Sequence, residues 1–103
     1  MLKLVSKFTL KKNLLCKGSL ATKSGHACAL GQYLLACGAD RKKLICSICS
    51  DIYFDMGETP PQYQEIESIN DGIGKFVNLK AFKEKLPLLC KKFKELGVTM
   101  KVK

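Results

Sequence analysis

The residues best suited to chemistry are a single histidine and a set of cysteines. His26 and Cys28, followed by Cys46 and Cys49, supply one imidazole and three thiolates, an acceptable ligand set for tetrahedral zinc. The spacing fits only in part, because the first pair is one residue too close and the second lies inside a predicted helix. Free cysteine is also among the most buried residue types. We therefore expect reduced structural cysteines with no metal and no cofactor; if any metal binds, these four residues are its ligands.

Two enzyme classes share parts of this pattern. Cys46-Ser-Ile-Cys49 has the dithiol spacing of thioredoxin-like enzymes, but those need a helix N-terminus after a strand to lower the pKa of the nucleophile. Here the pair falls in the second half of a predicted helix. Zinc nucleobase deaminases need a Glu two residues after the zinc-binding His, and Cys28 occupies that position. Neither interpretation is favoured.

Two further motifs also lack the partners that catalysis would need. A catalytic pair built on His26 requires an orienting carboxylate, and no sequence pattern brings one to it. Asn70-Asp-Gly-Ile-Gly74 is too short for a phosphate-binding loop and lacks the Lys-Ser/Thr that would follow. It predicts a glycine-containing turn in which Asn70 and Asp71 bond to local backbone. We therefore expect that the protein is not an enzyme.

Charge is the strongest compositional signal. The chain has a net charge of +9, with basic segments at 1–50 and 75–103. Between them lies an acidic strip that contains no basic residue and consists of Asp51, Asp55, Glu58, Glu65, Glu67 and Asp71. A basic body favours anionic partners and fast electrostatic association. Internal ion pairs between the strip and the body explain the same pattern equally well.

A basic face on two predicted helices is the first candidate binding surface: Lys80, Lys83, Lys91, Lys92 and Lys94 on the last helix, and Arg41, Lys42 and Lys43 on an earlier one. The acidic strip is the second. The lysines are not interleaved with aromatic residues, which stack on the bases of single strands, and the chain has only one arginine to read base edges. We therefore favour a protein partner, with phosphate-led nucleic-acid binding as the alternative.

The element expected to hold the fold together is a nearly uncharged helix within residues 24–38. Leu30, Leu34 and Cys37 repeat at helical spacing on its buried face. Gly31 in its interior predicts a close backbone approach, and Gly38 predicts its end.

The elements before and after this helix are shorter. The N-terminal half predicts a strand over 2–7, a short helix between Thr9 and Gly18, a loop or hairpin over 18–26, and a helix from Arg41 to about residue 52 that Asp40 caps. The C-terminal half predicts a loop over 53–61, a helix from Pro60 through Ser68, a helix capped by Asn78 that kinks or restarts at Pro87, and a strand over 98–103.

The two terminal strands can pair with each other. The expected fold class is therefore α+β: a mostly helical single compact domain over 1–103, with four to five short helices and a minimal sheet from the terminal strands. No apolar stretch approaches the ~20 residues of a membrane span, and lysines interrupt the N-terminus too often for a signal peptide. We expect a cytoplasmic protein without a membrane partner.

Several short motifs occur in a familiar order: Ser24-Gly-His-x-Cys28-Ala-Leu-Gly31, Ala36-x-Gly38, Ile69-Asn-Asp-Gly72 and Phe93-x-x-Leu-Gly-Val98. In this the chain resembles a family of small phage and bacterial proteins of unknown activity. The resemblance implies a compact helical domain, often encoded on mobile elements, and supplies no activity. It makes a component of the host cell the expected partner, which the protein would bind or inhibit.

Overall fold

The two ends of the chain lie side by side in the computed structural model, which describes residues 3–16, 20–46, 61–79 and 81–103. Strand β1 (Lys7–Leu10) pairs in parallel with β2 (Thr99–Val102), so that Phe8 is opposite Met100. The ladder continues past the strands, because Lys103 N donates to the Leu10 carbonyl at 2.9 Å. The predicted pairing of the termini is confirmed.

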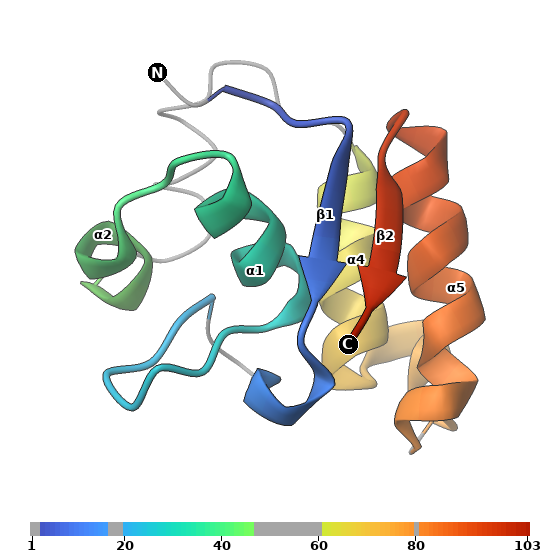
Figure 1. The fold of residues 1–103 in the computed structure, drawn as a ribbon. Coiled ribbons are helices and arrows are strands. Elements are labelled where there is room, and N and C mark those ends of the chain that lie inside the picture. Colours follow the sequence, from blue (N-terminus) through green and yellow to red (C-terminus); the bar gives the residue numbers. More distant parts are fainter. Residues whose placement is uncertain (1–2, 17–19, 47–60, 80) are drawn as a thin grey trace.

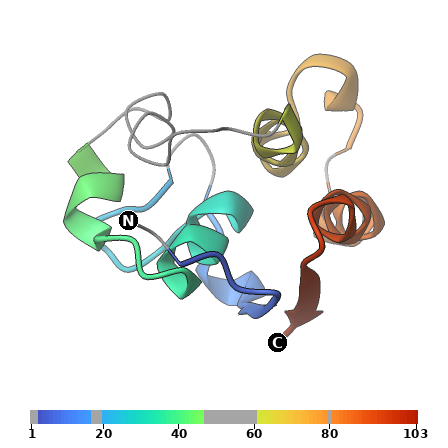
Figure 2. The same cartoon turned by 90° about the horizontal axis from the view of Figure 1, so that it is seen from above.

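Four α-helices occur in the described residues: α1 (Ala29–Ala36), α2 (Arg41–Cys46), α4 (Pro61–Asp71) and α5 (Phe82–Glu95). Two short 3-10 helices, η1 (Lys12–Leu14) and η2 (Gly74–Phe76), lie in connections. The sheet lies in front of α4, between α1 and α5, and α2 stands apart on the α1 side (Figures 1 and 2). The predicted α+β class, with a minimal sheet from the terminal strands, is confirmed. None of the described helices combines the length and apolar character needed to cross a membrane.

An aromatic cluster joins the sheet to the helices. Phe8 of β1 meets Tyr33 of α1 and Phe93 of α5, with ring centroids 5.4 and 4.9 Å away, and Tyr33 also meets Tyr63 of α4 at 6.4 Å. These rings are buried, and edge-to-face aromatic pairs stabilise a core beyond the area that they bury. The cluster explains why β1 covers 7–10 rather than the predicted 2–7: Phe8 and Leu10 are the side chains that this core can bury.

The central helix has the predicted buried face and end, but it begins at Ala29 and not near residue 24, because the preceding residues form the hairpin. Leu30, Leu34 and Cys37 are buried, and Gly38 has a φ of 96°, the left-handed conformation that ends a helix. A Cβ placed on Gly31 would overlap the carbonyl of Leu20, so this glycine does allow a close backbone approach. Upstream, Ala21 and Ala27 form an antiparallel bridge, which supports a tight hairpin before the helix.

Other predicted boundaries need correction. The short helix expected after Thr9 is only η1, because Thr9 and Leu10 belong to β1. Helix α4 runs to Asp71 instead of Ser68, and α5 begins at Phe82, well after Asn78. Helix α5 also continues through Pro87 without restarting.

The remaining predictions concern the second helix and the loop that follows it. The Asp40 carboxylate accepts from Lys42 N at 3.0 Å and so caps α2 as expected. The continuation of this helix beyond Cys46 and residues 53–60 of the predicted loop lie outside the described residues. Pro61, the last residue of that predicted loop, instead begins α4.

Candidate binding surface

The outer side of the sheet carries a row of lysines that we call the lysine face: Lys7, Lys11, Lys101 and Lys103, all exposed. Side chains alternate along a strand, and Phe8, Leu10 and Met100 point inward, so the lysines point to solvent. Lys7 is opposite Thr99, and Lys101 is opposite Thr9. Within the strands each lysine therefore faces a threonine, which avoids placing two like charges directly opposite each other.

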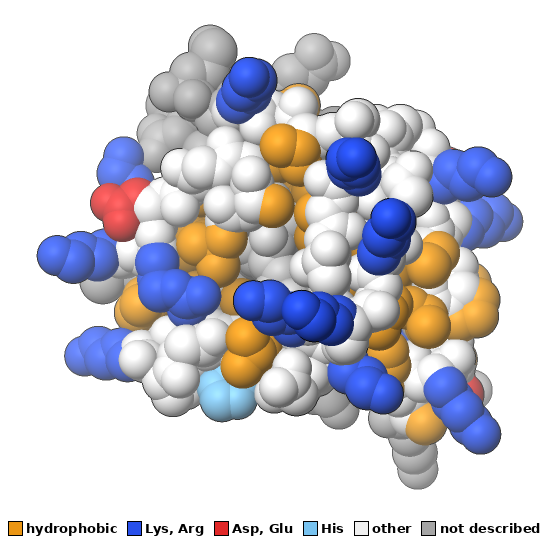
Figure 3. Space-filling view, viewed as in Figure 1, with side chains coloured by type: hydrophobic (Ala, Val, Ile, Leu, Met, Phe, Trp, Pro, Cys, Tyr) orange, Lys and Arg blue, Asp and Glu red, His pale blue; other side chains and the backbone are white. Residues whose placement is uncertain are grey.

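The lysine face belongs to a broader basic surface. Figure 3 shows Lys and Arg side chains spread over this whole side of the molecule, from α2 across the sheet to α5, with red acidic groups only at its margins. The sequence did not predict that these four lysines share one surface, because two of them precede α1 and two follow α5. Their alternation with apolar residues was visible in both terminal segments, but only the strand register shows that they lie together.

The predicted basic residues of α5 are only partly available to a partner. Lys83, Lys91 and Lys94 are exposed, and Lys80 lies outside the described residues. Lys92 is instead half-buried between two carboxylates, Glu65 at 2.5 Å and Glu95 at 3.3 Å. Its ammonium group lowers the pKa of Glu65, and that carboxylate in turn raises the pKa of Lys92. This ion pair joins α4 to α5.

The basic residues predicted on α2 divide in the same way. Lys42 and Lys43 are exposed, but Arg41 is half-buried. The guanidinium of Arg41 donates to the carbonyls of Thr22 and His26 at 3.4 and 3.5 Å, which ties α2 to the hairpin. Figure 1 places α2 and α5 on opposite sides of the sheet, so the two predicted sets do not form one compact patch.

The acidic strip is described only in its second half. Asp51, Asp55 and Glu58 lie outside the described residues. Of the others, Glu65 pairs with Lys92, and the Asp71 carboxylate accepts from Asn70 Nδ2 at 3.0 Å. Glu67 is half-buried on the same helix. At least two carboxylates of the strip are therefore engaged within the protein.

The residues proposed as metal ligands are not assembled in the described part of the chain. His26 Nδ1 lies 3.1 Å from Ser24 Oγ, in the hairpin. Cys28 is buried at the N-terminus of α1, where its sulfur accepts from Gly31 N at 3.3 Å. Burial raises the pKa of Cys28 to about 12, so it is a neutral thiol at physiological pH and a poor ligand or nucleophile.

The other half of the cysteine set cannot be placed in a site. Cys46 ends α2, and Cys49 lies outside the described residues. Within the described ranges, no three His, Cys, Asp or Glu side chains form a group that could hold a metal ion.

Asn70 does not have the role that the sequence predicted for it. It lies in the last turn of α4 rather than in a turn after the helix, and it is only 6% exposed. Its Oδ1 accepts from Ala29 N at 2.9 Å, and its Nδ2 donates to the Cys16 carbonyl at 2.8 Å. Its own carbonyl accepts from Lys85 Nζ at 2.9 Å. The side chain thus bonds to backbone far away in the sequence, and we call Asn70 with these partners the Asn70 network.

Comparisons with known proteins give no match to a protein family, a curated protein or a solved structure.

Proposed function

We propose that this protein is a non-enzymatic interaction module that binds an acidic protein surface through its lysine face. The observation that supports this most directly is the strand register, which gathers Lys7, Lys11, Lys101 and Lys103 on one exposed surface. Such a concentration of one charge raises the rate of encounter with an oppositely charged partner. The resemblance to mobile-element proteins makes a host protein the kind of partner proposed.

A protein partner is favoured over nucleic acid by the composition of the surface. The single arginine is occupied by backbone carbonyls, and the four aromatic rings that bridge sheet and helices are buried. This arginine is therefore not available to read bases, and these four rings are not available to stack on them.

Nucleic acid remains the second candidate because threonines alternate with the lysines on the face. Lysine and threonine side chains are common donors to phosphate oxygens. Binding of this kind would be independent of sequence and steeply dependent on salt.

The first experiment compares two double charge reversals. Lys7→Glu with Lys101→Glu alters the lysine face, and Lys83→Glu with Lys91→Glu alters an exposed part of α5 as a matched control. Retention on immobilised poly-glutamate at ~0.15 M salt is the measurement. We expect the first pair to abolish retention and the second pair to reduce it only slightly. If only the α5 pair abolished retention, the binding surface would instead be the basic face predicted on the last helix.

Duplex DNA separates the two candidate partners. If four lysines each replace a phosphate counterion, the logarithm of the DNA affinity falls with the logarithm of salt concentration with a slope of about −3.6. The protein-partner proposal predicts weak DNA binding that largely vanishes at ~0.15 M salt. Retention of DNA at that salt, lost when Lys7 and Lys101 are reversed, would favour the nucleic-acid candidate.

A further inference from the structure

A cavity of about 340 Å³ lies between η1 and the start of α5, at the border of the Asn70 network. Its lining is Lys12, Leu15, Cys16, Asn70, Phe82, Lys85 and Leu89. This volume is at the lower end of the ~300–1,000 Å³ range of small-molecule sites. Its lining differs from the lysine face, since three of its lining residues are apolar and two of its polar residues are buried.

The two ends of the cavity differ in polarity. At one end, Lys85 Nζ donates a hydrogen bond to the Asn70 carbonyl. Asn70 is 6% exposed and Lys85 is 5% exposed. The Asp71 carboxylate is also at that end, where it accepts from Asn70 Nδ2 at 3.0 Å. The Lys85 ammonium and this carboxylate carry opposite charges, so this end offers an anion no net positive charge.

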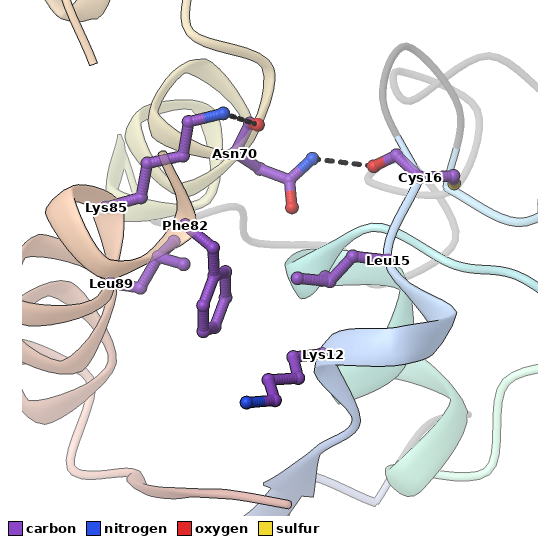
Figure 4. Close-up of a pocket in the computed structure, with 7 residues that line it drawn as sticks. All are labelled: Lys12, Leu15, Cys16, Asn70, Phe82, Lys85 and Leu89. Atoms are coloured by element: carbon purple, nitrogen blue, oxygen red, sulfur yellow. Dashed lines mark hydrogen bonds between the residues drawn. The ribbon is translucent and has the colours of Figure 1, made fainter. Parts of the chain in front are cut away.

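The other end is positively charged. Lys12 is exposed, and Figure 4 shows its amine directed toward the space beneath Phe82. Lys11, Lys12 and Lys103 also line a common hollow beside it, where Lys12 N donates to the Lys103 carbonyl at 3.4 Å. Lys12 is therefore the lysine at this mouth, and Lys11 and Lys103 add positive charge in the neighbouring hollow, which favours a negatively charged group.

The walls between the two ends are apolar. Leu15 from the segment after η1 and Phe82 from α5 extend into the cavity from opposite sides in Figure 4, and Leu89 lies behind Phe82 on the next turns of the helix. Leu15 and Phe82 are only half-buried, so they retain surface that a ligand can cover. Transfer of an apolar group from water to such a surface is favourable.

We propose that this cavity binds a small amphipathic carboxylate. The carboxylate lies at the mouth formed by Lys12 and its neighbouring lysines, and the apolar tail extends between Leu15 and Phe82 toward Leu89. The polarity of the two ends fixes this orientation. It also predicts discrimination against neutral molecules of the same length, which would gain the apolar contact without the charge.

The chain length of the ligand tests the apolar part. Butyrate, hexanoate and octanoate are titrated into the full chain by calorimetry, with octanol as the neutral reference. Each methylene buried at about 0.8 kcal/mol strengthens binding roughly fourfold. We expect affinity to rise along the series and octanol to bind more weakly than octanoate. Equal binding of octanol and octanoate, or no octanoate binding at millimolar concentration, would overturn the proposal.

Two variants test the location. Lys12→Met removes the charge and keeps the stem, and we expect octanoate affinity to fall about twofold to fivefold, as for an exposed ion pair. Lys83→Met is the control, because Lys83 is exposed on α5 but does not line the cavity. Leu15→Trp fills the cavity and should weaken octanoate by more than tenfold. Unchanged binding in Lys12→Met would contradict the proposed orientation.

NMR keeps the test decisive if the tryptophan variant does not fold. In the unaltered protein, the octanoate methyl group should give nuclear Overhauser contacts to the Phe82 ring and to Leu89. Contacts to other side chains only would show that octanoate binds elsewhere and would refute the site. Neither outcome depends on Lys7 or Lys101, the two residues altered in the test of the lysine face, since they do not line the cavity.

Discussion

The lysine face and the Asn70 network are both polar regions built from distant parts of the chain, but one is exposed and the other is buried. On the lysine face each ammonium group remains in water, and the sheet does not depend on any one of them. In the Asn70 network each polar atom has a named protein partner within 3.0 Å. Burial of a polar group is tolerated only when such partners exist, because the group has lost its hydrogen bonds to water.

This difference separates two kinds of constraint on the sequence. Residues of the exposed region are constrained by what they bind, and their charges act as a sum. Residues of the buried region are constrained by folding, and each atom acts through its own partner. The comparison can be tested by replacing residues in each region and measuring stability.

The largest effect is expected for Asn70→Ala. This change leaves the buried amide of Ala29 and the half-buried carbonyl of Cys16 without their bonds to Asn70, and an unsatisfied buried group costs about 1–3 kcal/mol. We expect the free energy of unfolding to fall by about 2–5 kcal/mol in urea denaturation. Asn78→Ala is the matched control, because Asn78 is exposed, and should change stability by less than ~0.5 kcal/mol. Similar small effects of both changes would show that the network does not hold the fold.

A smaller loss of stability is expected for Gly31→Ala. This change displaces the start of α1, where Asn70 Oδ1 accepts a hydrogen bond from Ala29 N. Glycine to alanine in a helix interior normally stabilises by up to ~1 kcal/mol. Here the added Cβ would overlap the Leu20 carbonyl, and such overpacking destabilises by about 1–3 kcal/mol. The sign of the change in melting temperature is therefore diagnostic. A rise would mean that the hairpin before α1 yields easily, and that the buried region is less constrained than proposed.

The local elements were largely predictable from the sequence, since helical spacing identified Leu30, Leu34 and Cys37 as buried and alternation identified the C-terminal strand. Capping by Asp40 and the end of α1 at Gly38 follow from the chemistry of single residues. The N-terminal strand was predicted too early in the chain, because Leu4 alternates with lysines just as Phe8 does. Leu4 is nevertheless 60% exposed. Only the aromatic partners of Phe8 decide which of the two is inside.

The candidate sites were harder to predict because they depend on contacts between distant segments. Asn70 next to Asp71 and Gly72 has the composition of a turn, and nothing local indicates that its partners are Ala29 and Cys16. The lysine face requires the register of two strands separated by almost the whole chain. The sequence showed that the protein is basic, but it did not show which lysines lie together.

The smallest effect on stability is expected for Lys101→Glu on the lysine face. Lys101 is exposed and lies opposite Thr9, so the change removes no buried contact. It lowers the repulsion among the surrounding lysines, and we expect a gain of at most ~0.5 kcal/mol in the free energy of unfolding at low salt. At ~1 M salt, where the Debye length shortens to about 3 Å, the gain should disappear. Urea denaturation at both salt concentrations measures it. A loss above ~1 kcal/mol at either salt would mean that the Lys101 stem packs on the sheet, and the lysine face would then share the structural role that we assign to the buried network alone.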